Sequence, residues 1–195
     1  MLILNGTWVR IFLLIALITF ISTMGSKALY NRGSQVEKYI IGNAGEYLSD
    51  TTSADEIIAA LYSVISGPAG EKRNWDRFRS LFFPGARMIA TGKRPDGQAV
   101  IRVMDPEEYI KTSGAYIEKN GFFEKEINRK TESFGTVTHC FSTYETRSKA
   151  EDEKPSQRGI NSIQLFNDGK RWWIMTVYWF PEGKDNAIPD EYLKQ

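Results

Sequence analysis

The sequence predicts an α+β fold with an antiparallel sheet, and three observations lead to it. Two segments with helical spacing of apolar residues come first, and a third helical segment follows a pair of strand-like runs. Four long strand-like runs joined by turns complete the chain. Helices gathered ahead of a meander of strands are typical of α+β domains. The 195 residues, 42% of them hydrophobic, suffice for one domain with a core and exclude a wholly disordered chain.

The first predicted helix lies in "TSADEIIAALYSVISG". Ser53 is a suitable N-cap with Glu56 three residues further on, and Gly67-Pro68 ends the helix. Its apolar positions recur at helical spacing; they are Ile57, Ile58, Leu61, Tyr62 and Ile65. This segment therefore predicts an amphipathic helix with one face on the core.

Two further helices are predicted by their boundary residues. In "NWDRFRSLFF", Asn74 is the cap and Pro84-Gly85 the expected terminator. In "PEEYIKTSGAYIEKN", Asp105 is the cap, Pro106 takes the first helical position and Asn120-Gly121 ends the helix.

The remaining segments predict strands. "ARMIATG" and "QAVIRVM" flank the turn residues "KRPDG", and the other runs are "FFEKEINRKTESFG", "TVTHCFSTYETRS", "GINSIQLFN" and "RWWIMTVYWF". Between them stand the turn signals Phe134-Gly135, "KAEDEKPSQ" and Asn167-Asp168-Gly169.

The last strand is apolar on both sides. Strict alternation places Trp172, Ile174, Thr176, Tyr178 and Phe180 on one face. It places Trp173, Met175, Val177 and Trp179 on the other. A strand with one face on water should show polar residues at every second position, so we expect both faces to be covered. Core packing and burial in a dimer explain most of these aromatic residues, and a share of them are expected to touch a ligand.

The N-terminus resembles a secretory signal peptide. Arg10 precedes the apolar run 11–21, and small residues follow it, with Ala28 as a suitable cleavage position. An uncleaved membrane anchor and a buried core helix are the alternatives; the run is short for a membrane span. We therefore expect an exported protein, periplasmic or extracellular, or one held at the membrane only by this segment.

These boundaries divide the chain into four parts. They are a signal peptide or anchor at 1–28, a linker at 29–50, a folded domain at 51–183 and a C-terminal tail at 184–195.

Composition excludes several classes of function. The formal net charge of +1 does not suggest a nucleic-acid binder. The only cysteine is Cys140 and the only histidine is His139, so there is no zinc-ligand spacing. Phosphate-binding glycine motifs and the serine elbow of hydrolases are also missing from the sequence. We expect neither a metal nor a cofactor.

Three stretches carry a resemblance to a known superfamily. They are "NWDRFRSLFFPGARMIATG", "GTVTHCFSTYETR" and "GINSIQLFNDGKRWWIMTVYWF". With the element order, they resemble the nuclear transport factor 2-like superfamily, which includes SnoaL-like polyketide cyclases and ketosteroid isomerase, over about residues 51–182. The resemblance implies a curved sheet wrapped around three helices as a cone-shaped barrel, with an internal apolar pocket. It also implies a homodimer formed through the convex sheet face.

Placed on this cone, six residues are expected to line the pocket; they are Tyr62, Phe78, Tyr109, His139, Phe141 and Trp179. Fold alone does not imply function, because the superfamily includes enzymes, binding proteins and transport adaptors.

The resemblance also implies where an acidic catalytic pair would fall, and this sequence departs from it. In 82–88 the positions read Pro84-Gly85-Ala86, which removes the most obvious general base. Asp76 remains, but an acid near a helix start is commonly favoured by the helix dipole alone.

His139 and Glu145 are the other weak catalytic candidates, and no catalytic residue is assigned. They share one face of a predicted strand with Phe141, Thr143 and Arg147. If that face lines the cone, His139 could act as an acid or base near neutral pH. The competing interpretation is a structural histidine and a surface ion pair. Cys140 points to the opposite face, which argues against a Cys–His couple.

Three functions stay open at this point. The first is an exported domain that binds a small apolar or amphipathic molecule without catalysis. The second is an isomerase, dehydratase or cyclase that uses His139 as acid–base, with Tyr144, Tyr62 or Tyr109 as hydroxyl donors. The third is a module that docks another envelope protein through an exposed aromatic face.

Overall fold

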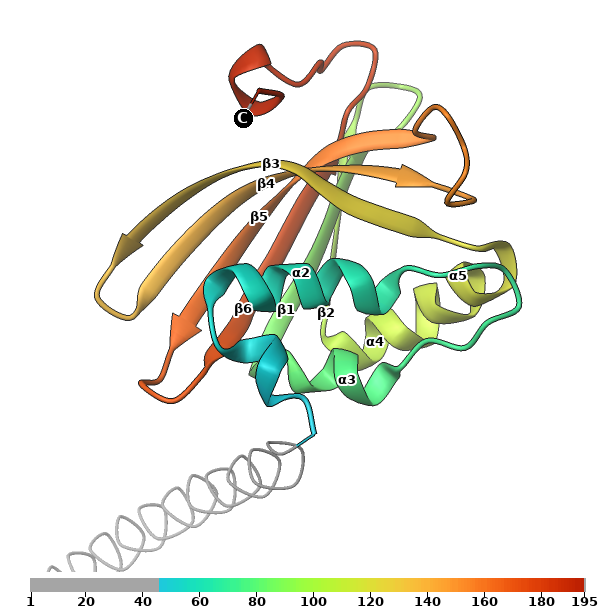
Figure 1. Ribbon diagram of the computed structural model, residues 1–195. Helices are drawn as coiled ribbons and strands as arrows, with labels where there is room; N and C mark the ends of the chain where they lie inside the picture. Colours follow the sequence, from blue (N-terminus) through green and yellow to red (C-terminus); the bar gives the residue numbers. More distant parts are fainter. Residues whose placement is uncertain (1–45, 195) are drawn as a thin grey trace, which may run out of the picture. The chain divides into compact units, whose positions relative to one another are not determined.

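Six strands form one curved sheet, shown in Figure 1, in the computed structural model, which describes residues 46–194. The order across the sheet is β2-β1-β6-β5-β4-β3. The strands are β1 (Phe82–Lys93), β2 (Ala99–Met104), β3 (Phe123–Phe134), β4 (Val137–Arg147), β5 (Gln157–Asn167) and β6 (Trp172–Pro181). The predicted α+β class and the six predicted strands are confirmed. The predicted leader and most of the predicted linker lie outside the described residues.

One strand pair departs from the antiparallel expectation. β1 and β6 run parallel, whereas every other neighbouring pair is antiparallel. The hairpin with β5 fixes the direction of β6, and β1 has to start where the preceding helix ends. The two strands therefore meet in the same direction.

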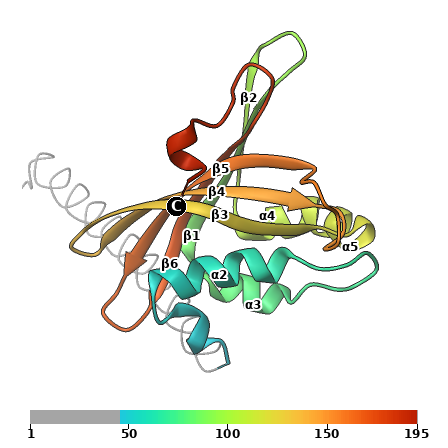
Figure 2. The same cartoon turned by 45° about the horizontal axis from the view of Figure 1, so that its top comes forward.

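The main helices lie on one side of the sheet (Figure 2). They are α2 (Ala54–Ile65), α3 (Trp75–Ser80), α4 (Pro106–Tyr109) and α5 (Ala115–Asn120), the last two joined by the π-helical turn η2 (Ile110–Gly114). Within residues 46–194, none of the helices combines the length and the apolar character that crossing a membrane would need.

The predicted N-caps are confirmed by their hydrogen bonds. The Ser53 hydroxyl accepts from the Glu56 amide at 3.0 Å, and the Asn74 side chain accepts from the Arg77 amide at 2.9 Å. Asp105 accepts from the Glu108 amide at 2.8 Å. Each cap satisfies a backbone N–H that the first helical turn leaves without a partner.

The prediction that Pro84-Gly85 ends the second helix is wrong. The helix ends at Ser80, and Pro84-Gly85 lies inside β1, where the pairing with β6 is irregular between Phe82 and Arg87. Proline cannot donate a ladder hydrogen bond, so such an irregularity is where a strand tolerates it.

A β-bulge in β6 overturns the predicted alternation of the last strand. Gln164 pairs with Thr176 and Leu165 pairs with Ile174, so Met175 is an extra residue that faces no partner. The core-facing side is therefore Trp172 and Ile174 before the bulge, and Val177 and Trp179 after it. Strict alternation had separated these two pairs onto opposite faces.

Trp173 lies on the outer side and is nevertheless only 1% exposed. The ring of Phe83 meets it edge-on, and its pairing partner on β5 is Phe166, whose ring also meets Phe83 edge-on. The Arg171 guanidinium lies over Trp173 at 3.8 Å from the ring centre. Both faces of the last strand are therefore covered around Trp173, as the sequence indicated, whereas Tyr178 further along the outer face is 45% exposed.

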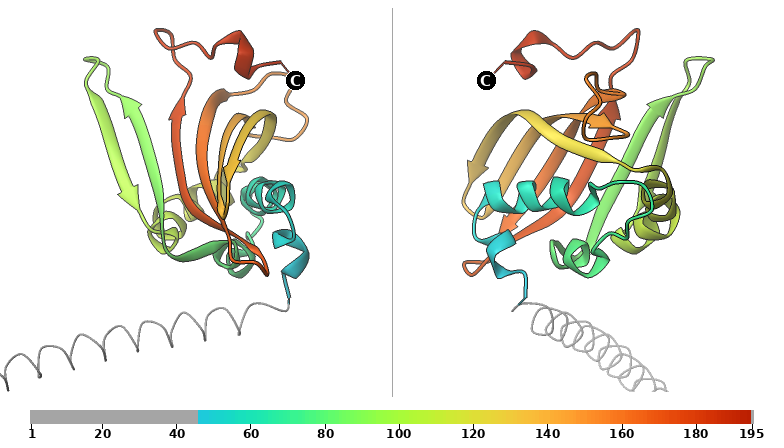
Figure 3. Two further views of the ribbon diagram at one scale, coloured as in Figure 1. Left: turned by 90° about the vertical axis from the view of Figure 1, so that its left-hand side faces the viewer. Right: turned by 45° about the vertical axis from the view of Figure 1, so that its right-hand side comes forward.

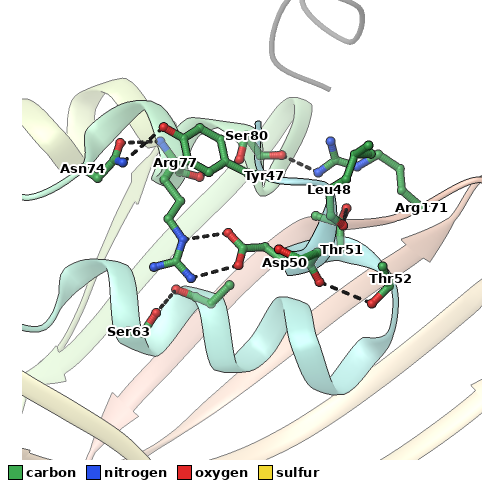
Figure 4. Close-up of polar contacts among 12 residues, drawn as sticks. Tyr47, Leu48, Asp50, Thr51, Thr52, Ser63, Asn74, Arg77, Ser80 and Arg171 are labelled. Atoms are coloured by element: carbon green, nitrogen blue, oxygen red, sulfur yellow. Dashed lines mark hydrogen bonds and ion pairs between the residues drawn. The ribbon is translucent and has the colours of Figure 1, made fainter. Parts of the chain in front are cut away.

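The folded part begins before the predicted boundary at residue 51. Asp50, in the short helix η1 (Leu48–Thr51), accepts two hydrogen bonds from the Arg77 guanidinium, at 2.6 and 2.9 Å (Figure 4). The Tyr47 hydroxyl accepts another from Asn74 at 3.1 Å. Bidentate Arg–carboxylate pairs fix geometry well, so the end of the predicted linker is part of the domain.

The predicted C-terminal tail also packs on the domain, on the side of the sheet away from the helices (Figure 3). Ile188 is buried, and the carbonyl of Tyr192, in the short helix η3 (Asp190–Tyr192), accepts a hydrogen bond from Thr143 at 2.7 Å. Glu191 forms an ion pair with Lys130 at 2.8 Å. Residues 184–194 therefore cover part of the outer sheet face.

Candidate functional site

A small cavity of about 110 Å³ lies between the helices and the inner face of the sheet, and we call it the cone cavity. Its walls come from α2, α3, α4 and all strands except β2. The lining residues are Leu61, Ile65, Phe78, Met88, Tyr109, Phe122, Glu124, Tyr144, Asn161, Val177 and Trp179. All of these lining residues are aliphatic or aromatic except Glu124, with its carboxyl group, and Asn161, with its amide.

A larger and more polar groove of about 800 Å³ runs between α2 and the start of β3, and we call it the outer groove. Asp55, Tyr62, Ser63 and Arg129 are among its lining residues. Glu124 lines both the outer groove and the cone cavity. Its carboxyl group therefore lies where an apolar space meets a polar one.

The backbone around Glu124 is held by the end of α2. The Glu124 amide donates to the Ser66 hydroxyl at 2.9 Å, and Gly67 and Phe122 exchange hydrogen bonds as an isolated bridge. Gly121 ends α5 with a φ of 76°, a conformation that glycine adopts without strain. The turn after α5 thus delivers Glu124 into the first residues of β3, beside the cavity.

Burial raises the pKa of Glu124 to about 8, and a hydrogen bond with Asn161 opposes part of that rise. Within the described part of the chain Glu124 forms no ion pair. Nearby, burial first and the charge of Glu124 second raise the pKa values of the Tyr109 and Tyr144 hydroxyls. These tyrosines therefore stay protonated and can act only as neutral donors or acceptors.

The Tyr109 and Tyr144 hydroxyls form no hydrogen bond among residues 46–194, and the two residues are 9% and 5% exposed. No fully buried side-chain nitrogen or oxygen in these residues lacks a partner, so both hydroxyl oxygens reach open space. Both residues line the cone cavity. Gly159, opposite Tyr144 on β5, leaves room for this ring, because a Cβ there would lie 2.5 Å from the ring carbon Cζ. Polar groups inside a protein nearly always have partners, so hydroxyls that reach a cavity without a protein partner mark a place for a ligand or water.

The structure places the six expected pocket residues in three locations. Phe78, Tyr109 and Trp179 line the cone cavity, and Tyr62 lines the outer groove with its hydroxyl directed at Asn161. His139 and Phe141 lie on the outer face of the sheet.

The face of β4 that lines the interior is the opposite of the one considered for catalysis. Cys140, Ser142 and Tyr144 are the buried inner residues of this strand. On the outer face, His139 Nε2 and the Ser162 hydroxyl share a hydrogen bond of 2.9 Å, and the ring of Phe141 packs against Tyr192. The alternation along β4 predicts which residues share a face, but it does not predict which face lines the interior.

Glu145 and Asp76 are bound in ion pairs away from the cavity. Glu145 contacts Arg147 at 2.6 Å and Lys125 at 3.1 Å on the outer face. Asp76 contacts Arg79 at 2.8 Å with its side chain 78% exposed. Neither carboxylate lines the cone cavity.

Sequence reasoning missed Glu124 and Asn161. Both sit at inner positions of strands whose polar residues look like ordinary solvent-facing alternation. A usable signal was present in "FFEKEIN", where Glu124 and Glu126 share one face of a strand that follows an aromatic pair. The inner direction of that face became clear only from the packing of α2 over β3.

Metal binding has no geometric support in the described part of the chain. Residues 46–194 contain no group of three His, Cys, Asp or Glu side chains arranged to hold a metal ion.

Solved structures with a similar fold place this architecture among known ones. A protein of unknown function with a cystatin-like fold from Nostoc punctiforme superposes with a TM-score of 0.50 at 11% identity, over 68% of this chain and 96% of its own. A nuclear transport factor 2-like protein of unknown function from Shewanella baltica has a TM-score of 0.41 at 14% identity, over 67% and 91%. Another from Methylobacillus flagellatus has 0.40 at 17% identity, over 68% and 96%.

No protein-family model and no curated protein matches the sequence. At these identities the likeness to solved structures concerns the fold alone. At that level the predicted α+β architecture, with a curved six-stranded sheet closing over helices, is confirmed. Nuclear transport factor 2-like proteins are among the solved structures that this chain is similar to.

Proposed function

We propose that this domain binds a small amphipathic molecule, with a compact apolar end in the cone cavity and a polar end in the outer groove. The observation that carries this proposal is a set of polar groups, without an ion pair or without any protein hydrogen bond, around an otherwise apolar cavity. These groups are the Glu124 carboxyl and the Tyr109 and Tyr144 hydroxyls. A pocket of this kind, apolar with a few converging polar groups, is the usual form of a small-molecule site.

The size of the cavity limits what enters it. Ligand pockets commonly measure about 300–1,000 Å³, and a dry engineered cavity of about 150 Å³ holds benzene. The cone cavity, at about 110 Å³, has room for only a short branched or cyclic group. A larger ligand therefore has to extend past Glu124 into the outer groove of about 800 Å³.

The polar groups indicate which chemistry the inserted end carries. The two tyrosine hydroxyls can donate, and near neutral pH much of Glu124 holds a proton that it can also donate. Three donors converging on one space fit an oxygen acceptor such as a carbonyl, ether or hydroxyl. The ionised form of Glu124 accepts instead, so the preference for acceptors is expected to weaken as the pH rises above 8.

Acid–base catalysis is the second candidate, and one observation favours it. A carboxyl with a pKa of about 8, beside two tyrosine hydroxyls, can give or take a proton at physiological pH. In an isomerase, dehydratase or cyclase, Glu124 rather than His139 would be the acid–base group, because only Glu124 lines the cavity. Binding remains the first candidate because it needs nothing beyond the cavity and its donors.

Native mass spectrometry of the protein made in its own host tests the binding proposal. A co-purified mass that is present in the wild type and lost in Tyr144→Phe and Glu124→Gln is the expected result. His139→Ala is the matched control, since His139 lies on the outer face and should keep the bound mass. A wild-type protein that carries no small molecule, or a mass that survives both inner-face substitutions, would overturn the proposal.

Export and dimerisation are further parts of the proposed function. Export is supported by the apolar run 11–21 that follows Arg10. A homodimer is supported by Ile101, Val103 and Tyr178, which are 65%, 53% and 45% exposed. Their pairing through β1 places them on one outer face. N-terminal sequencing of the mature protein tests export, and light scattering of Val103→Glu beside the wild type tests the dimer.

A further inference from the structure

A chain of hydrogen bonds leads from the cone cavity to the outer groove through Tyr62. Asn161 Nδ2 lies 3.0 Å from the Tyr62 hydroxyl, and that hydroxyl lies 2.6 Å from Ser142 Oγ. Ser142 Oγ lies 2.6 Å from Glu126 Oε1, which also contacts Arg129 Nε at 3.1 Å. Tyr62, Ser142 and Asn161 are all buried, and both hydrogen bonds of the Tyr62 hydroxyl lie in the interior.

The chain has only one possible direction. The Glu126 carboxylate, paired with Arg129, can only accept, so the single hydroxyl hydrogen of Ser142 is donated to it. Ser142 then has to accept from Tyr62, which uses the only hydrogen of the tyrosine hydroxyl. Tyr62 in turn has to accept from the amide nitrogen of Asn161.

This direction decides how the Asn161 amide is oriented. An asparagine side chain can turn its oxygen or its nitrogen toward a neighbour, and its partners determine which. Since Tyr62 can only accept here, the nitrogen faces Tyr62. The contact between Asn161 and Glu124 favours the ionised form of the carboxyl, which is the effect of an N–H donor.

We infer that Tyr62 is a positioning residue: its hydroxyl, held between Ser142 and Asn161, keeps the Asn161 amide turned with its N–H groups toward Glu124. The inference rests on the proposed role of Glu124 in the cone cavity and names the groups that set its protonation. Glu126, two residues from Glu124 and outside the cone cavity, fixes the direction of the whole chain. The second function candidate depends on this arrangement as much as the first, since it sets the proton affinity of the same carboxyl.

The titratable and charged groups near Glu124 come from each packed element. The hydroxyls are Tyr62 from α2, Tyr109 from α4 and Tyr144 from β4. The charged groups of the outer groove are Asp55, Glu56, Lys125, Glu126, Arg129, Arg147 and Asp152. Among these neighbours, Asn161 is the one whose choice between donating to Glu124 and accepting from it is set by the hydrogen-bond chain through Tyr62.

The test is the titration of Glu124 in the ligand-free protein, followed by carbon-13 NMR of the glutamate side-chain carboxyls. Glu124→Gln assigns the signal. Ser142→Ala frees the Tyr62 hydroxyl to donate, and Tyr62→Phe removes it. In both variants the Asn161 oxygen can turn toward protonated Glu124, so the midpoint of the titration is expected to rise by about one pH unit.

Thr138→Val is the matched control. It removes a buried hydroxyl from the same face of β4 as Ser142. The Thr138 hydroxyl shares a hydrogen bond with Ser133 and takes no part in the hydrogen-bond chain through Tyr62. Its Glu124 midpoint should equal that of the wild type. Ser142→Ala and Tyr62→Phe could lower the unfolding temperature and leave the midpoint of the Glu124 titration unchanged. In that case the hydrogen-bond chain is only structural and the inference is wrong.

Ser142→Ala keeps the test decisive if Tyr62→Phe does not fold, because it loses only one oxygen atom from the strand. The titration needs no ligand. A midpoint that moves as expected in a protein that retains no small molecule would support the positioning role and count against the binding proposal. The two proposals can therefore fail separately.

Discussion

Glu124 and Glu145 are two carboxyl groups on adjacent strands whose pKa values move in opposite directions. Glu145 pairs in register with Lys125, the residue next to Glu124, but the two carboxyls point to opposite faces of the sheet. Burial by itself acts to raise the pKa of each carboxyl. At Glu145 the hydrogen bonds from Arg147 and Lys125 outweigh burial, and its pKa falls below the usual range. At Glu124 no cation pairs with the carboxyl, and the pKa rises to about 8. Burial therefore decides the sign at Glu124, where no cation opposes it, and the partners Arg147 and Lys125 decide it at Glu145.

The largest effect is expected when Glu124 is neutralised. Its folded pKa of about 8 lies above the ordinary value of 4.5, so between these values the folded protein holds a proton that the unfolded chain has released. This contribution to stability is complete below pH 4.5 and is lost as the pH rises toward 8. Glu124→Gln should remove that loss, and above pH 8 it should be more stable than the wild type by roughly 2–3 kcal/mol.

Urea unfolding at pH 5 and at pH 8.5 measures this difference. Partial exposure of Glu124 to the outer groove keeps the expected value below the full effect of its pKa shift. Equal dependence of stability on pH in the two proteins would show that Glu124 is charged in the folded state without cost, and the comparison with Glu145 would fail.

Gly159→Ala should change the free energy of unfolding by less than Glu124→Gln does above pH 8. The added Cβ would meet the ring and hydroxyl of Tyr144 and lie 2.7 Å from the backbone oxygen of Phe180. Because the backbone oxygen cannot move away easily, we expect a loss of about 2 kcal/mol in the free energy of unfolding. Tyr144→Phe/Gly159→Ala, measured beside both single variants, shows whether the hydroxyl causes the clash. Fully additive losses would mean that the Tyr144 hydroxyl does not contribute to the clash.

The contribution of Glu145 to stability should depend on pH with the opposite sign to that of Glu124, and Glu145→Gln tests this. The lowered pKa of Glu145 means that its contribution is present above the unfolded value and lost as the pH falls through the folded one. The substitution is therefore expected to cost about 1 kcal/mol at pH 7 and almost nothing at pH 3. Thermal unfolding at these two pH values checks the sign, and a cost that grows in acid would contradict the assignment.

His139→Ala is expected to have the smallest effect. The side chain shares one hydrogen bond with Ser162 and lies 3.9 Å from a carboxylate oxygen of Glu132, whose side chain is 87% exposed. The loss in unfolding free energy should stay below about 0.5 kcal/mol, with the Glu124 titration unchanged. A shifted Glu124 midpoint in this variant would mean that the two sheet faces are coupled, and the contrast between them would need revision.

The features that the sequence predicted well are those decided by neighbouring residues. The caps at Ser53, Asn74 and Asp105 depend on a side chain and an amide three residues away, and all three form as predicted. The strands were also recognisable from local alternation. By contrast, nothing near His139 in the chain indicates that helix α2 covers the other face of its strand.

The candidate site was mostly out of reach for the same reason. Phe78, Tyr109 and Trp179 could be placed at the cavity because large aromatic side chains seek the interior wherever it lies. Glu124 could not, because a carboxyl in a strand ordinarily faces water. Its inward position follows from the turn at Gly121 and the clamp at Ser66, which involve residues far apart in the sequence.

The bulge at Met175 has a consequence for the kinds of sequence change that the domain can absorb. Because one additional residue carries Val177 and Trp179 to the inner face, deleting it would send both to the outer face and bring Tyr178 inside. A single-codon deletion here would exchange the two surfaces of half a strand, whereas substituting Met175 would leave them in place. Any comparison of related chains along β6 therefore has to establish the length of this strand before equating its residues.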